Sequence, residues 1–375
     1  MSAETPLRTS TAEIQADNLD VASQWRLMWL KFKRHRLAVI SAVVLVIVYS
    51  VGLFAEFLAP NDPHENNRRV VHAPPQRIRF IGEDGFSLRP FVYGYKSEVD
   101  PYTLRRSYVP DPDQVNYLKF FVKGHPYKFL GLWETDIHLF GVEDGTFFPL
   151  GTDRLGRCVF SRIVYGTRVS TSIGLIGVFL SLLLGIIIGG FSGYYGGIVD
   201  TLVQRLIEFL RSVPTIPLWM ALSAALPRNW TPIQVYMGIT VILSFIGWTG
   251  LARVVRSKFL ALREEDFVMA ANLLGASRLR IIFRHMVPSF MSHIIASVTL
   301  SIPSMILGET SLSFLGLGLR APVISWGVLL QEAQNVRTIA LTPWLLAPGF
   351  MVIITILAFN FVGDGLRDAA DPYVR

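Results

Sequence analysis

Long apolar stretches alternate with polar segments along this chain. Runs of about 18 or more apolar residues are long enough to cross a hydrocarbon core of about 30 Å. Five runs meet that length, and we expect each to be a membrane-spanning helix: Leu37–Leu58, Val169–Gly197, Ile233–Ala252, Val287–Leu307 and Leu341–Val362. A shorter run, Val213–Leu226, contains Pro214 and Pro217, and we expect it to be a span with a broken start that neighbouring protein tolerates. The pattern therefore predicts an all-α membrane protein with six transmembrane helices.

One face of the second run has almost no side chains. Small residues recur on it at every fourth position: Gly177, Ser181, Gly185, Gly189, Gly193 and Gly197. Lipid provides no hydrophobic drive for helices to associate, and a face of small residues lets two helix backbones approach closely. We expect this helix to be buried in a bundle, with its last four glycines as packing positions.

A charged and interrupted stretch, 264–286, separates two of the apolar runs. Its first part has one narrow apolar face with helical spacing: Phe267, Ala270, Ala271 and Leu274. Acids occupy the first turn, where the helix dipole favours them: Glu264, Glu265 and Asp266. Gly275 suits the left-handed position that ends a helix.

A second short helix is expected to follow, with Ser277 as its cap. Its apolar residues repeat the same spacing: Leu279, Ile282, Phe283 and Met286. Basic residues lie between them: Arg278, Arg280, Arg284 and His285. The stretch predicts two short helices joined by an elbow, with Pro288 opening the next span.

Two interpretations of the elbow are open. It could lie on lipid headgroups, although its acidic start disfavours this because the cytoplasmic leaflet is itself anionic. It could instead enter a groove of a protein partner. The small Ala270 and Ala271 leave room for a larger group against that face, which favours the partner.

The N-terminal region contains two different segments. Residues 1–20 are polar and poor in aromatics, which predicts a disordered cytoplasmic tail. Residues 21–36 place Trp25, Trp29 and Phe32 at helical spacing among basic residues. This indicates either an amphipathic interfacial helix or a plain extension of the first span, 37–58.

Residues 59–158 form a polar insert between the first two spans. The insert has too many aromatic residues for a disordered linker, and KFFVKGHPYKFLG predicts a hairpin whose turn is at Gly124–Pro126. We expect a small mixed α/β domain outside the membrane, with the core permease domain at 159–375. The insert could be a docking platform for an extracellular partner, a cover for the channel mouth or a family decoration.

Composition and charge agree with a membrane location. Of the 375 residues, 51% are hydrophobic and 17% are charged, against roughly 25% charged in soluble domains. The net charge of +7 could indicate nucleic acid, but the basic residues concentrate at the ends of apolar runs, as in KFKRHR before the first. The positive-inside rule explains that placement and puts both termini and 264–286 in the cytoplasm. A basic cluster in the insert region counts against the rule: Arg154, Arg157, Arg162 and Arg168.

The sequence contains no recognisable catalytic or metal site. It has no G-x-x-x-x-G-K-[ST] phosphate loop, so the chain is not an ATPase. Glu309 near the end of the fifth run is a candidate because acids at membrane depth are usually functional; it either hydrogen-bonds in the interior or contacts solute. Pro303 is either a gate hinge or a static kink. Cys158 is the single cysteine, so no internal disulfide forms.

The elbow resembles the coupling motif of ABC-importer permeases, E-A-A-x3-G-x9-I-x-L-P. Ala270–Ala271, Gly275 and Pro288 match it, while Met269, His285 and Val287 replace its Glu, Ile and Leu. Three more segments are similar to the dipeptide and oligopeptide permease subfamily: PLGTDRLGRCVFSRIVYGTRVS, LGETSLSFLGLGLRAPVISWG and LAFNFVGDGLRDAADPYVR. The resemblance extends from about Pro149 to Arg375. Cys158 stands where the subfamily carries an acid, and the long insert is unusual for it.

The resemblance implies the type I ABC importer fold in a bacterial inner membrane. It implies a heterodimer with a second permease subunit, two cytoplasmic ATPase subunits that bind ATP and Mg, and an extracytoplasmic solute-binding protein. Membrane lipid is the remaining partner; no cofactor on this chain and no nucleic acid are expected. The elbow residues that would couple to the ATPases are Glu264, Glu265, Asp266, Phe267, Ala270, Ala271, Leu274, Gly275, Arg280 and Arg284.

The resemblance and the sequence features also bear on the transported solute and on alternative functions. Peptides are the first expectation for the cargo, with oligosaccharides or nickel chelates as alternatives. An ion-coupled secondary transporter would need inverted repeats and ionisable residues at the midplane, and neither is found. A membrane enzyme or receptor would need a polar catalytic cluster in the insert, and none is visible.

Overall fold

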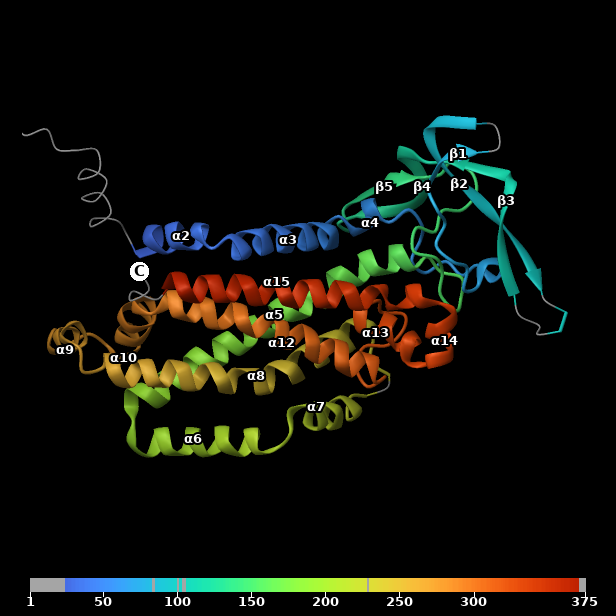
Figure 1. Cartoon of the computed structure of the whole chain (residues 1–375). Helices are drawn as coiled ribbons and strands as arrows, with labels where there is room; N and C mark the ends of the chain where they lie inside the picture. The colour runs from blue at the N-terminus through green and yellow to red at the C-terminus, as the bar shows by residue number, and fades with distance from the viewer. Residues whose placement is uncertain (1–23, 83–84, 100, 103–105, 228, 371–375) are drawn as a thin grey trace, which may run out of the picture.

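Long helices lie side by side and form the body of the molecule (Figure 1). The computed structural model describes residues 24–82, 85–99, 101–102, 106–227 and 229–370. Within them, five helices are long and apolar enough to cross a membrane, the last together with the turn η4 (Pro343–Leu346) before it. They are α3 (Arg36–Leu53), α5 (Val159–Tyr195), α8 (Pro232–Leu262), α12 (Met291–Phe314) and α15 (Ala347–Ala370). Each overlaps one of the five long apolar runs, which confirms the prediction of a long apolar helix at each run, although the bounds differ.

Local sequence signals explain where several helices begin and end. Before α8, the Thr231 hydroxyl accepts from the N–H of Gln234 while the Gln234 side chain accepts from the N–H of Thr231. This capping box, with Pro232 in the first helical position, fixes the start of the helix. α5 ends at Gly196, whose φ of 63° lies in the left-handed region that favours glycine.

The sixth apolar run does not form a single long helix. α7 (Thr215–Ala224) has 10 residues, about half the length that a span requires. α6 (Gly197–Ser212) directly precedes it, and the two helices follow one another along the bundle in Figure 1. Pro214 lies between them, and its ring prevents one continuous helix. The predicted break is therefore found, but the helix before it was missed.

The N-terminal helix α2 (Gln24–Arg34) is separate from α3. Nδ1 of His35 accepts from the N–H of Ala38 at 3.1 Å and caps α3, so α2 is not a plain extension of the span. Phe32 of α2 packs against Ala38 and against Ala369 near the end of α15. The expected disordered tail, 1–20, lies outside the described residues.

The insert between α3 and α5 is built from β-strands. It follows the short α4 (Ala55–Leu58), and the turn η1 (Arg68–Val70) precedes its strands. One antiparallel sheet has the order β1 (Arg79–Gly82), β2 (Gly85–Val99), β3 (Arg106–Tyr117), and a second pairs β4 (Lys119–Phe129) with β5 (Trp133–Gly141). Within its described residues the insert has no α-helix, so the mixed α/β expectation was wrong. Its aromatic-rich runs have the composition that favours pleated strands.

The predicted hairpin turn at Gly124–Pro126 was also wrong. These residues lie inside β4, where the register against β5 shifts between Lys123 and Tyr127. The turn comes later, and Leu130 and Gly131 in it have positive φ values of 51° and 74°. Glycine and proline interrupt a regular ladder at bulges as well as at turns, and the sequence did not distinguish the two.

An ion network joins the base of the insert to the loops after α12. The buried Asp153 accepts from Nε of Arg157 at 2.7 Å and from Nη1 of Arg162. Nη2 of Arg157 lies 3.2 Å from Oε1 of Glu332. Three short elements carry these loops: α13 (Trp326–Gln331), η3 (Glu332–Gln334) and α14 (Val336–Leu341). Arg157 and Arg162, two of the four arginines that counted against the charge rule, are therefore structural, because both pair with the buried Asp153.

The insert and the segment after α8 lie at opposite ends of the bundle. Figure 1 shows β1 to β5 at one end, and α9 (Asp266–Leu273) and α10 (Arg278–Arg280) at the other. The start of α2 and the end of α15 lie at the same end as α9. A membrane crossed by these helices would therefore separate the insert from α9.

Candidate coupling surface

Helix α9 exposes most of its predicted apolar face. Ala271 is buried, but Phe267 is exposed and Leu274 is 87% exposed. Val268, which the spacing did not select, points inward and is fully buried, while Leu273 is 89% exposed. The other predicted residues in and directly before this helix are exposed as well: Glu264, Glu265, Asp266 and Ala270. α9 thus offers an apolar surface with an acidic start.

Gly275 forms the elbow, as the sequence predicts. Its φ is 75°, and its N–H donates to the carbonyl of Asn272 at 3.0 Å while the N–H of Ala276 donates to Ala271 at 3.1 Å. These two bonds are the Schellman arrangement that ends helices. The hydroxyl of Ser277 then accepts from the N–H of Arg280 at 3.4 Å and caps the next helix.

The second elbow helix differs from the prediction. After α10 the chain winds as a π-helical segment, η2 (Ile281–Met286), then α11 (Val287–Ser289), and α12 begins only at Met291. A π-helix has wider turns than an α-helix. Residues selected at α-helical spacing therefore do not all lie on the same face of this segment. The inward residues are Ile281, Ile282 and Met286. The outward ones are Leu279, Arg280, Phe283 and Arg284.

The elbow rests on a compact apolar socket. Val268 and Ala271 share a buried cluster with Phe259 of α8. The rings of Phe259 and Phe290 meet edge to face with centroids 5.8 Å apart, an arrangement that aromatic pairs favour. The outer surface of the elbow is therefore open while its inner surface is fixed to the spanning helices.

Sequence reasoning missed the tyrosines at the end of α5 that reach the elbow. The hydroxyl of Tyr194 lies 3.4 Å from Oδ1 of Asn272, and the guanidinium of Arg278 lies 5.2 Å from the ring centroid of Tyr195. The signal available was an aromatic pair directly before the helix-ending Gly196. These contacts connect α5 to both halves of the elbow.

Three of the four predicted packing glycines lie against α8: Gly185, Gly189 and Gly193. The closest approach is at Gly189, where a Cβ would lie 2.4 Å from the carbonyl oxygen of Ala252. Gly197 does not share this packing, because nothing lies within 4 Å of its Cβ position. It is the first residue of α6, and its φ of 56° explains the glycine there.

Glu309 is fully buried in α12 and accepts from three serine hydroxyls. The donors are Ser170 at 3.2 Å, Ser313 at 2.8 Å and Ser325 at 2.7 Å. Each hydroxyl also accepts a backbone N–H, from Trp326, Leu319 and Val328 respectively. The geometry fits a buried hydrogen-bonding role that holds α5, α12 and the start of α13 together. Pro303 is buried in an unbroken α12, and its role as a hinge stays a prediction.

Cys158 lies directly before α5 and is buried among Val70, Ala73 and Phe148. Burial raises the pKa of its thiol, so the thiol stays protonated and unreactive. The side chain of Cys158 therefore makes an apolar contact at the base of the insert.

Comparisons with known proteins identify the family. Residues 181–375 match the binding-protein-dependent transport system inner membrane component family. Residues 23–75 match the N-terminal TM domain of oligopeptide transport permease C. The family match covers more than half of the chain.

Individual relatives agree with this match. The chain is 40% identical over 226 residues to the oligopeptide transport system permease protein OppC of Bacillus subtilis (strain 168). That alignment covers 60% of this chain and 72% of OppC. The chain is 29% identical over 348 residues to the dipeptide transport system permease protein DppC of Haemophilus influenzae, which covers 92% and 94%. Among solved structures, the inward-facing MetNI methionine ABC transporter aligns with a TM-score of 0.43 at 16% identity, over 56% of this chain and 97% of that one. The chain belongs to the binding-protein-dependent transport system inner membrane components, and it is a membrane-spanning transport subunit of an ABC importer rather than an enzyme.

Proposed function

We propose that this chain forms half of the translocation path of an ATP-driven importer for peptides, which a solute-binding protein delivers. Relatives that serve oligopeptide and dipeptide transport systems support peptides over oligosaccharides or nickel chelates. A second, different permease subunit completes the path. Two ATPase subunits bind ATP and Mg²⁺, and this chain binds no cofactor itself.

The proposed topology has six crossings in a bacterial inner membrane. α6 and α7 together make the third crossing, with the break at Pro214 between them. Both termini and the elbow are cytoplasmic and the insert is extracytoplasmic. The basic end of α2, which has Lys31, Lys33 and Arg34 in its last turn, supports this orientation because basic residues favour the cytoplasmic side.

The elbow carries the proposal. Leu273 and Leu274 are almost fully exposed on a short helix whose inner face is fixed in an apolar socket. Contiguous exposed apolar residues with a polar rim mark an interaction site, and a short helix fits a groove on a partner. The rim residues proposed to contact the ATPase are Glu264, Glu265, Asp266, Arg280 and Arg284. Closing of the ATPases would then move the elbow and the attached spans between two arrangements.

Substitutions at Gly275 test the elbow. Nothing lies within 4 Å of its Cβ position, so a new side chain acts through the positive φ alone. Gly275→Val should abolish ATP-dependent peptide uptake into proteoliposomes, because a β-branched residue strongly disfavours that φ. Gly275→Asn should keep uptake, because Asn tolerates the left-handed region. Normal uptake in the correctly inserted Val variant would show that the elbow does not transmit the movement of the ATPases to the spans.

Two further measurements separate the rival functions. Identification of the solute that co-purifies with the cognate binding protein distinguishes peptides from oligosaccharides and nickel chelates. Uptake that continues without the ATPase subunits would indicate an ion-coupled transporter and contradict the proposal.

A further inference from the structure

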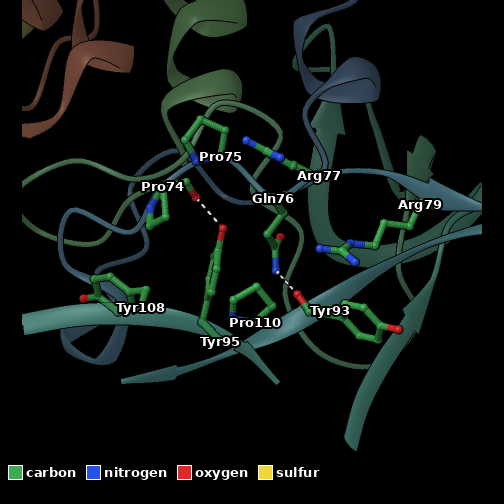
Figure 2. Close-up of a pocket in the computed structure, with 9 residues that line it drawn as sticks. All are labelled: Pro74, Pro75, Gln76, Arg77, Arg79, Tyr93, Tyr95, Tyr108 and Pro110. Atoms are coloured by element: carbon green, nitrogen blue, oxygen red, sulfur yellow. Dashed lines mark hydrogen bonds between the residues drawn. The ribbon is translucent and has the colours of Figure 1, made fainter. Parts of the chain in front are cut away.

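The insert carries a hollow of about 460 Å³ between the segment before β1 and the face of strands β2 and β3. Figure 2 shows Tyr95 at its centre, with its hydroxyl directed to the carbonyl of Pro74 at 2.9 Å. The side chain of Gln76 donates to the carbonyl of Tyr93 at 3.0 Å. These bonds fix the walls, so the hollow is a formed feature of the fold.

Two neighbouring hollows continue this one. The first shares Pro74 and Tyr108 with it and reaches Trp344 at the outer end of the last span. The second shares Arg79 and Tyr93 and lies toward the edge of the sheet. We call the three together the sheet groove. It runs from the sheet of the insert to the permease core, so an occupant would touch both.

The sheet groove is basic and aromatic. Three arginines line it, Arg77, Arg79 and Arg106, and no Asp or Glu is among its lining residues. Arg79 lies 5.1 Å from the ring centroid of Tyr93, and Arg106 donates to the carbonyl of Arg68 at 2.9 Å. Within the described residues, none of the three arginines forms an ion pair. Their charges are thus available to an anionic partner.

We propose that the sheet groove binds an extended acidic segment of the solute-binding protein. Carboxylates of the segment would pair with the arginines, whose planar donors match carboxylate geometry. Apolar residues or prolines of the segment would lie on Tyr93, Tyr95 and Tyr108, as in grooves that bind extended peptides. The length of the groove and its contact with the core fit a chain segment of a protein seated over the outer mouth.

This inference depends on the proposed function for the identity of the partner. The test uses the complete transporter in nanodiscs, its cognate binding protein and two charge-reversal variants. Arg77→Glu with Arg79→Glu changes the groove. Arg89→Glu with Lys96→Glu is the matched control, because both residues are exposed on β2 and line no part of the groove.

The groove variant should weaken the affinity for the binding protein at least about tenfold and flatten its salt dependence, since steering by charge is lost. The control should stay within about twofold of the wild type, as expected for charges outside the contact. Arg77→Gln with Arg79→Gln should give an intermediate loss, which separates lost attraction from new repulsion. Wild-type affinity in the charge-reversal variant would overturn the proposal.

A peptide probe tests the chemistry of the occupant. A blocked hexapeptide of alternating Glu and Pro should compete with the binding protein, and the same peptide with Gln in place of Glu should not. Equal competition by both peptides would contradict the acidic segment. Peptide uptake is measured separately. If the transporter takes up no peptide but still needs Arg77 and Arg79 to bind its binding protein, peptides are not the transported solute, while the proposal for the sheet groove still holds.

Discussion

Arg256 on α8 and Asp200 on α6 form a two-point ion pair, with Nη2 2.5 Å from Oδ2 and Nε donating to Oδ1. The hydroxyl of Ser192, near the end of α5, donates to the same carboxylate at 2.6 Å. Gly193 lies against the backbone of Arg256 at the same level. One carboxylate therefore joins three helices at the end of the bundle where the elbow lies.

Asp200→Asn should lower the thermal stability of the purified protein. Both side chains are mostly buried, and loss of hydrogen bonds between charged groups costs about 1.5–3 kcal/mol. Arg205→Gln is the control, because its 2.8 Å pair with Glu208 is largely exposed and such pairs contribute little. Thermal unfolding in detergent measures both. Equal midpoints for the two variants would show that the Asp200 pair does not hold α6.

Gly189→Ala should destabilise the packing of α5 on α8. The new Cβ would lie 2.4 Å from the Ala252 carbonyl oxygen, which is backbone and cannot turn away, and overpacking of this kind costs about 1–3 kcal/mol. Gly177→Ala on the same stripe should be tolerated, because its nearest neighbour would be 3.5 Å away. The yield of monodisperse protein and its unfolding midpoint distinguish the two. Similar midpoints and yields for the two variants would show that the close contact of α5 with α8 at Gly189 does not stabilise the protein.

Glu309→Leu should destabilise the protein far more than Glu309→Gln. Leucine leaves three serine hydroxyls without their acceptor, and each buried unsatisfied group costs about 1–3 kcal/mol. The amide oxygen of glutamine can still accept from the nearer donors, Ser313 and Ser325. Unfolding midpoints and peptide uptake should both rank wild type, Gln and Leu in that order. A Gln variant that is stable but transports nothing would instead favour contact between Glu309 and solute.

The sequence predicted features that depend on local chemistry. Apolar length determines the spans, and the positive φ of Gly275 and the cap at Ser277 follow from residue type. Glycines at every fourth position predicted the close contact of α5, although the spacing alone could not show that Gly197 starts a new helix.

Features that depend on tertiary contacts were not predictable in this way. Ile281 at the start of the π-helical η2 lies inward while Leu279 of α10 before it lies outward, because packing against Phe259 competes with the α-helical period. The sheet groove is lined by residues distant in sequence, such as Gln76 and Trp344. No single stretch of the sequence therefore indicates it.

The insert should lose stability as the pH falls, through His125 on β4. Its ring lies 4.4 Å from that of His138, and its Nε2 is buried without a partner in the described structure. Burial, and then the neighbouring His138, lower the pKa of His125 below 6.5, while Asp62 acts in the opposite direction. The folded state therefore favours the neutral ring. Its contribution is complete above 6.5 and is lost as the pH falls through the lower folded pKa.

Hydrogen exchange of β4 and β5 between about pH 8 and about pH 5, corrected for intrinsic rates, measures this loss. His125→Gln should remove part of the pH dependence, because glutamine carries no titrating group. His64→Gln, at an exposed histidine next to the same Asp62, should keep the wild-type profile. If protection of these strands rises as the pH falls, the folded state binds the proton more tightly than the unfolded chain and the sign of the linkage is wrong. The contact of His138 with the carbonyl of Glu56, at 3.1 Å, connects these strands to α4, which directly follows the first span.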